Sequence, residues 1–167
     1  HHSITAENNV TKESIRLAKR YIKDRRLPDA AIDLVDRTMA ALRMLNDTGL
    51  KDIEVFKQTI AAWKETETKG EATKDIEDWK WLSRSFLNRI SPILSGQVNS
   101  EINAQLLETR EAVIKYLDEI TGNLTQLAGT ARNNLLKTDV AAIVSNKTGI
   151  PLGKLQSQEQ ERLLNME

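Results

Sequence analysis

Apolar residues recur at intervals of three and four along most of the chain, which is the spacing of amphipathic helices. No alternation of apolar and polar residues lasts long enough to predict a strand. The first helix is expected over about 11–24, and Pro28 starts a second helix that fades around 46–49. The pattern predicts a mostly α protein, in which the apolar faces of these two helices are Ile15, Ala18 and Ile22, then Ile32, Val35, Met39 and Leu42.

The middle of the chain carries further apolar stripes, interrupted by a polar loop at 64–74. One stripe covers 53–63, the next covers 76–93, and a coiled-coil-like stripe runs from about 100 to 136. As one helix, the last stripe would be on the order of 50 Å long and would need a partner along its length. We expect the segment 75–95 to be its antiparallel partner. The stripe consists of Ile102, Leu106, Val113, Leu117, Ile120, Leu124, Leu127, Ala131 and Leu135.

The C-terminal thirty residues change in character again. Thr138-Asp139 is expected to open a short helix, a turn follows at 148–153, and a polar helix covers 156–166.

Composition excludes several classes of protein. The 167 residues carry 24 Lys and Arg against 24 Asp and Glu, so the zero net charge excludes a globally basic nucleic-acid binder. The chain has no cysteine, which excludes a disulfide scaffold, a thiolate zinc site and a cysteine nucleophile. No stretch approaches the roughly 18 apolar residues of a membrane span, and no secretory signal is evident. We therefore expect a cytoplasmic protein.

Catalytic motifs are also missing. The phosphate-binding pattern G-x-x-x-x-G-K-[ST] does not occur, and the two histidines, His1 and His2, stand at the terminus. Asp33 and Asp36 share a helix face, where a solvated surface is favoured over an acid–base pair. An enzyme in its own right is not expected.

Residues 12–26 are locally basic, with seven Lys and Arg against two acidic residues. A phosphate-backbone contact is one interpretation. The favoured one is an exposed or interface face of an ordinary helix, because Tyr21 is the only aromatic residue there that could stack on a base.

Two short motifs are far more specific. The run DRRLPDAAIDLVD at 24–36 resembles the D-R-x-L-P-D-K-A-I-D-L-[IV]-D segment of ClpB and ClpC, the double-ring AAA+ unfoldases. Upstream, His1-His2-Ser3-Ile4 and Arg20-Tyr21-Ile22 are similar to the H-H-G-[VI] and R-Y-I of that family. In the family, this region closes the small helical domain of the first ATPase module.

Near the other end, the stretch from Val140-Ala141 through the run TGIPLGKL at 148–155 is similar to the family's V-x-x-W-T-G-I-P-[VL]-x-K-L. ERLLNME at 161–167 is similar to its E-x-x-x-L-L-x-[ML]-E, which leads into the second ATPase module. The departures are Ala30 for the usual lysine, Arg37-Thr38 for Glu-Ala, and Lys147 for tryptophan.

The resemblance implies three parts: a small helical lid subdomain at 1–47, a middle-domain coiled coil at 48–137, and a linker with the entry to the second module at 138–167. The middle part matches the family in periodicity alone. The implied fold is mostly α, with a small helical AAA+ lid followed by an antiparallel coiled-coil middle domain.

The resemblance also implies which residues would contact nucleotide. In the family, the small domain packs over nucleotide held by the large domain. Leu27, Pro28, Asp29 and Ile32 are then expected on the adenine side of the first site, and Ile150, Pro151 and Leu152 on that of the second. Apolar walls on rigid turns suit an aromatic base. The structural alternative is that Leu27 and Ile32 are core residues and that Pro28 simply starts a helix.

The implied function is that of a non-catalytic part of an ATP-dependent Clp-family protein unfoldase or chaperone, which relays nucleotide state and carries regulatory partner contacts. ATP is expected in the whole protein and no cofactor in this part alone. The implied partners are neighbouring subunits of a hexameric ring, protein substrates, and adaptor, chaperone or protease partners, without nucleic acid or membrane. The alternative is a free-standing helical adaptor or scaffold without ATPase activity.

Overall fold

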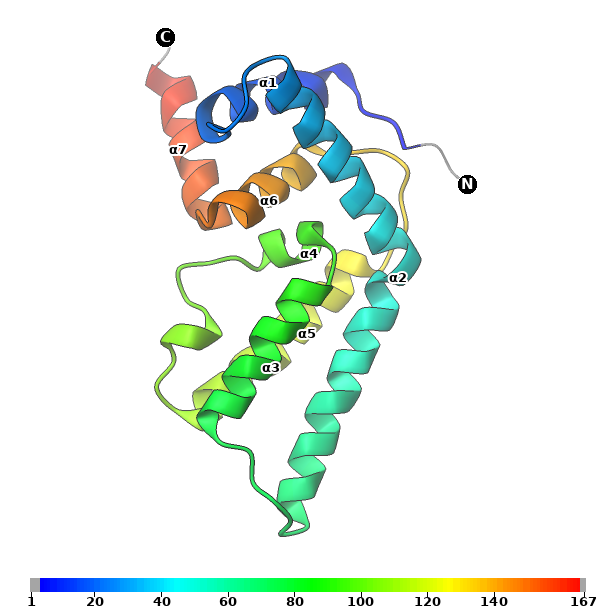
Figure 1. Cartoon of the computed structure of the whole chain (residues 1–167), viewed down its shortest axis with the longest axis vertical. Helices are drawn as coiled ribbons and strands as arrows, with labels where there is room; N and C mark the ends of the chain where they lie inside the picture. The colour runs from blue at the N-terminus through cyan, green and yellow to red at the C-terminus, as the bar shows by residue number, and fades with distance from the viewer. Residues whose placement is uncertain (1–3, 166–167) are drawn as a thin grey trace.

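The computed structural model describes residues 4–165, and in these residues it contains seven α-helices, one short 3-10 helix and no strand (Figure 1). The predicted mostly α class is confirmed. One end of the molecule, which we call the head, combines segments from both ends of the chain. The head consists of α1 (Asn8–Tyr21), the first half of α2 (Asp29–Thr68) up to residue 48, α6 (Lys137–Thr148) and α7 (Leu152–Asn165).

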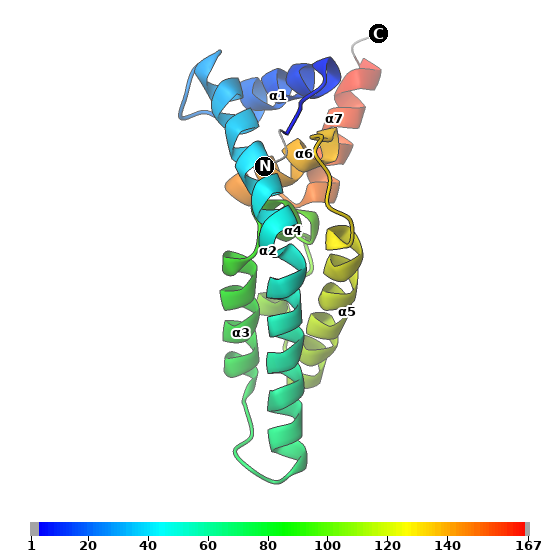
Figure 2. The same cartoon turned by 90° about the vertical axis from the view of Figure 1, so that its right-hand side faces the viewer.

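The other end is elongated, and we call it the rod. It consists of α2 from residue 49 onward, α3 (Ile76–Arg89) and α5 (Arg110–Ala128). The short helix α4 (Pro92–Gln97) lies where the head and the rod meet, and a loop with the 3-10 helix Ala104–Leu106 leads from α4 to α5 (Figure 2).

Helix α2 is one continuous helix of 40 residues, about 60 Å long at the usual rise per residue. The prediction that this helix fades around 46–49 is wrong, and the polar loop predicted at 64–74 begins only after Thr68. Asn46 and Gly49 are weak helix formers, but both make tertiary contacts inside the helix. The Asn46 amide donates to the Arg132 carbonyl at 2.8 Å, and Gly49 is buried close to Ala128 of α5. Packing therefore outweighs local propensity here.

The helices of the rod do not pair as predicted. The expected contact between the 75–95 segment and the later stripe is present, because α3 packs against α5. However, α3 and α5 run in the same direction, and α2 is antiparallel to both (Figures 1 and 2). The loop after α4 returns the chain to the far end of the rod before α5 begins, and this return reverses the expected orientation.

The expected helix over 100–136 is also wrong, because α5 covers only 19 residues. Thr109 caps it by accepting a hydrogen bond from the Ala112 amide at 3.2 Å, and Asn103 caps the preceding 3-10 turn in the same way. Ile102 is 68% exposed, so it is not part of a buried seam. Leu117, in contrast, is fully buried as the stripe predicts.

The remaining boundaries shift by a few residues. Helix α1 begins before Thr11, and α7 begins at Leu152 rather than at 156. The stripe at 76–93 is divided between α3 and α4, where the Ser91 hydroxyl accepts from the Ile93 amide at 3.3 Å. Of the predicted apolar faces, Ala18, Ile22 and Leu42 are buried, but Ile15 and Ile32 are exposed. The buried faces also include Leu17, Leu34, Ala41 and Leu45.

Head and rod share one continuous apolar core. In the head, every residue of α6 from Val140 to Ser145 is buried, as α1, α2 and α4 pack around this helix. In the rod, aromatic rings fill the space between α2 and α3. Phe56 stacks on Phe86 with ring centroids 3.7 Å apart, and Trp63 meets Trp79 edge-on at 5.1 Å.

Candidate functional site

The first candidate segment lies where α2 begins. Leu27 is 41% exposed and Ile32 is 57% exposed, so the structural alternative that these two residues are core is wrong. Pro28 occupies the N-cap position, and its carbonyl accepts from the Ile32 amide at 3.1 Å. Ala30, Ala31 and Leu34 are the residues of this turn that face inward. The structure thus leaves an apolar edge on the surface of the head.

The second candidate segment joins α6 to α7. Helix α6 ends at Gly149, whose φ of 78° is the left-handed conformation that favours glycine. Leu152 is buried in the core, whereas Ile150 and Pro151 are half-buried. The second segment is therefore less accessible than the first, and its Leu152 is foremost a packing residue.

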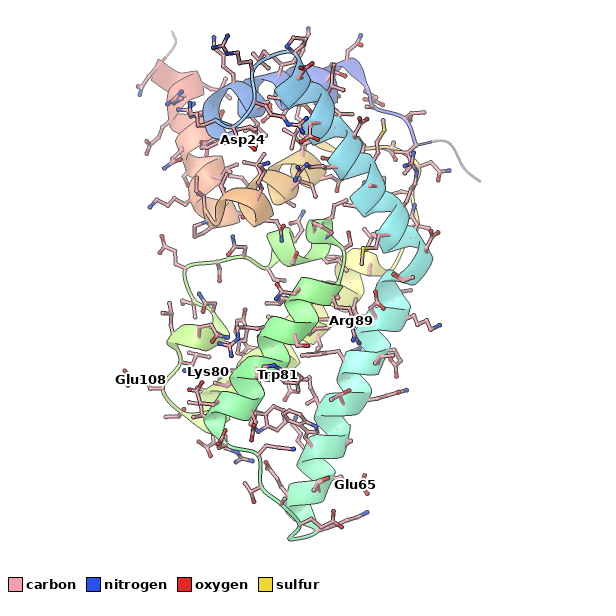
Figure 3. The ribbon with its side chains drawn as sticks, viewed as in Figure 1. Asp24, Glu65, Lys80, Trp81, Arg89 and Glu108 are labelled. Atoms are coloured by element: carbon pink, nitrogen blue, oxygen red, sulfur yellow. The ribbon has the colours of Figure 1, made fainter. Side chains whose placement is uncertain are left out.

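An ion pair links the two segments. Lys147, two residues before Gly149, places its Nζ 3.5 Å from Oδ2 of Asp24, three residues before Leu27. Figure 3 shows Asp24 in the connection between α1 and α2, on the side facing α6. A backbone hydrogen bond of Asp24 itself is the main cause that lowers the pKa of its carboxyl, and Lys147 lowers it further. The fold thus brings together two segments that are 123 positions apart in sequence.

The α6–α7 turn is also tied to the loop that follows α4. The side-chain amide of Asn99 donates to Oγ of Ser145 at 2.9 Å and to the carbonyl of Ile150 at 3.3 Å. In return, the Leu152 amide donates to the carbonyl of Asn99 at 3.1 Å. Sequence reasoning missed Asn99, because no local pattern marks it and its partners lie about fifty residues away.

A buried acidic residue holds α7 against α1. Glu159 is 3.3 Å from Nε of Arg16 and 3.1 Å from Nη1 of Arg20, and it accepts from the Tyr21 hydroxyl at 3.0 Å. Burial raises the pKa of Tyr21, and the hydrogen bond to Glu159 raises it further. The basic helix therefore supplies charges to an internal interface, which supports the favoured interpretation of residues 12–26.

The far end of the rod carries a second polar cluster. Arg110, the first residue of α5, forms an ion pair with Glu67 of α2 and donates from Nε to the Lys74 carbonyl at 2.7 Å. The hydrogen bond from Arg110 is the largest cause that lowers the pKa of Glu67. The Nζ atom of Lys74 also lies 4.9 Å from the centroid of the Trp63 ring. These contacts hold the loop between α2 and α3 against the N-terminus of α5.

Two grooves adjoin the head. One of about 380 Å³ lies between α2 and α6 and includes Met44, Pro92 and Ile143, with Arg37 and Lys147 at its rim. The other, of about 580 Å³, lies beside the α6–α7 turn and includes Pro151, Lys154 and Ile102. Within residues 4–165, no group of acidic or histidine side chains could hold a metal ion. The described helices also include none with the length and apolar character to cross a membrane. The matches at His1, His2, Met166 and Glu167 lie outside the described residues.

This architecture agrees with comparisons to known proteins. The chain belongs to the AAA lid domain family, whose family model matches residues 1–85. The matched part includes α1, the whole of α2 with the Leu27–Ile32 segment, and most of α3.

Similarity to individual proteins extends over the whole chain. The chain is 29% identical to the chaperone protein ClpB of Oceanobacillus iheyensis and 26% identical to the negative regulator of genetic competence ClpC/MecB of Bacillus subtilis. It is also 26% identical to the ATP-dependent Clp protease ATP-binding subunit ClpC of Staphylococcus aureus. Each alignment covers 100% of this chain but only 18% of the relative. The resemblance to ClpB and ClpC is thereby confirmed. No solved structure matches the chain.

Proposed function

We propose that this chain is the lid and middle region of an ATP-dependent Clp-type unfoldase or chaperone. In this proposal, residues 1–47 with 138–167 meet nucleotide, and residues 48–137 carry contacts with regulatory partners. ATP belongs to the whole protein, which acts in the cytoplasm as a hexameric ring on protein substrates. The names of the relatives, which include a chaperone and an ATP-binding protease subunit, support this assignment.

The observation that carries the proposal is the exposed apolar edge at the start of α2. Exposing Leu27 and Ile32 to water is unfavourable unless another surface covers them. Both residues fall in the segment that matches the lid family, and the polar Asp29 stands between them. An apolar edge with one polar group suits the base of a nucleotide held by a separate domain.

The test uses the full-length protein that contains this chain. Ile32→Asp should weaken binding of a fluorescent ATP analogue about tenfold, because a carboxylate replaces an apolar wall. The matched control is Leu50→Asp on the same helix, where Leu50 is 49% exposed but lies outside the candidate segment. Equal affinities of the two variants would contradict the proposed nucleotide contact.

The relay part of the proposal rests on the continuous helix α2. A displacement at its rod end reaches the Leu27–Ile32 segment through an unbroken hydrogen-bonded element. A free-standing adaptor is distinguished by inspecting the gene for phosphate-binding motifs on both sides of this segment. The 167-residue chain itself should release no phosphate above a buffer blank, because it has no phosphate-binding loop.

A further inference from the structure

Helix α4 lies between the rod and α6, and at Gly96 its backbone comes very close to that of α6. A Cβ atom added at Gly96 would lie 2.0 Å from the carbonyl oxygen of Ala142, so the two backbones are in direct contact. Asn146 of α6 also donates to the Ser95 hydroxyl at 2.8 Å. Just before α4, the Ser91 hydroxyl donates to the Ala41 carbonyl of α2 at 2.7 Å. Such close contacts move as a unit, because packed interiors do not deform easily.

Asn99 lies just beyond α4, at the start of the loop that leads to α5. Its side-chain amide has three acceptors within hydrogen-bonding distance: the carbonyl and hydroxyl of Ser145, at 3.3 and 2.9 Å, and the carbonyl of Ile150. Its backbone carbonyl accepts a hydrogen bond from the Leu152 amide. The Ser145 hydroxyl in turn donates to the Ile150 carbonyl at 2.6 Å. One residue thus contacts α6 and both ends of the Ile150–Leu152 turn.

Asn99 is also close to the rod helices along the chain. The loop after Asn99 reaches Arg110, where α5 begins, and the segment before it passes through α4 directly into α3. Two of the three rod helices therefore lead to this point from opposite directions along the chain. The third, α2, contacts α4 as well as α6.

We infer that Asn99 is a positioning residue that transmits displacements of the rod to the Ile150–Leu152 turn. When α3 or α5 shifts, α4 and its loop carry Asn99 along, and its hydrogen bonds move the turn. The consequence for nucleotide rests on the proposed function, because only there does this turn face an adenine. The mechanical link itself does not depend on it.

The link is tested in the 167-residue chain by a double-mutant cycle read by hydrogen exchange. Leu117→Ala leaves a cavity in the rod, and we expect the exchange rate of the Leu152 amide, 35 residues away in sequence, to rise about fivefold. Asn99→Ala alone should raise that rate about tenfold, through the loss of a hydrogen-bonded side chain. In the Asn99→Ala background, Leu117→Ala should then have no further effect on the Leu152 amide.

Asn146→Ala is the matched control, because it removes the bond to Ser95 at the same interface without touching the turn. In this background, Leu117→Ala should still raise the Leu152 exchange rate fivefold. The inference is overturned if Leu117→Ala acts equally in the Asn99→Ala and wild-type backgrounds, or if it never reaches Leu152. If Asn99→Ala does not fold, Ser145→Ala takes its place in the cycle, since it removes both an acceptor for Asn99 and the donor to Ile150.

A second measurement separates this inference from the proposed function. In the full-length protein, Asn99→Ala should reduce the effect of Leu117→Ala on ATP-analogue affinity to less than twofold. If the cycle behaves as expected in the 167-residue chain but analogue affinity never responds to either variant, the link stands and the nucleotide role of the turn is wrong.

Discussion

The head and the rod are built by two different kinds of packing. In the head, α6 is surrounded by other helices, and where the head meets the rod the small Gly96 of α4 lets its backbone approach Ala142 of α6 closely. In the rod, three helices lie side by side and large rings such as Phe56 and Trp79 fill the space between them. The contact between α4 and α6 is therefore intolerant of added volume, whereas the rod depends on keeping a dry apolar seam.

The largest expected effect is in the rod. Leu117→Asp places a carboxylate where Leu117 is fully buried, which should destabilise the rod by about 4 kcal/mol. Hydrogen exchange should show loss of protection across 76–89 and 110–128, while α1 keeps its protection. The matched control, Leu127→Asp in the same helix, should have little effect because Leu127 is 46% exposed. Loss of protection in α1 first would mean that head and rod do not unfold as separate units.

The next largest effect on stability is expected in α4, where the head and the rod meet. Gly96→Ala requires α4 to move away from α6, which should lower the free energy of unfolding by about 3 kcal/mol in denaturant melts. A stability equal to that of the wild type would contradict the close backbone contact.

The corresponding change in the rod has the opposite sign. A Cβ at Gly122 of α5 would have no atom within 4 Å, so Gly122→Ala should stabilise the protein by about 0.5–1 kcal/mol through helix propensity. Circular dichroism melts of the two alanine variants side by side give the comparison. Destabilisation by Gly122→Ala would mean that α5 is packed on a face where the structure leaves open space.

The smallest effect is the pH dependence of the ion pair at the end of the rod. Because the fold lowers the pKa of Glu67, the stabilisation is complete above about pH 4.5 and is lost as the pH falls through the lowered value. The pair is partly exposed, so the contribution is modest. Glu67→Gln should therefore flatten the decline of melting temperature below pH 4.5. An unchanged slope in this variant would exclude the pair as a source of acid sensitivity.

The sequence predicted the helical class and the burial of Leu117, because apolar residues at helical spacing form the face that a helix buries. It failed where both faces of a helix are apolar. Ile32 and Leu34 lie on different faces of α2, and spacing alone selected the exposed Ile32 for the core. It also ended α2 at Asn46, whose contact with Arg132 depends on residues 86 positions away.

The candidate segments were predictable from short motifs, but their surroundings were not. The motifs locate Leu27 and Pro151, yet nothing in them indicates that Asp24 meets Lys147 or that Asn99 holds the turn. These contacts arise when the two ends of the chain form one head, which is a property of the tertiary fold.

The central claim is that the head meets nucleotide while the rod does not. Hydrogen exchange of the full-length protein, with and without a non-hydrolysable ATP analogue, tests it most directly. We predict that the analogue slows exchange most strongly in residues 24–34 and 148–153 and far less in residues 76–89 of the rod. Slower exchange confined to the rod, or no change in either head segment at saturating analogue, would contradict the account.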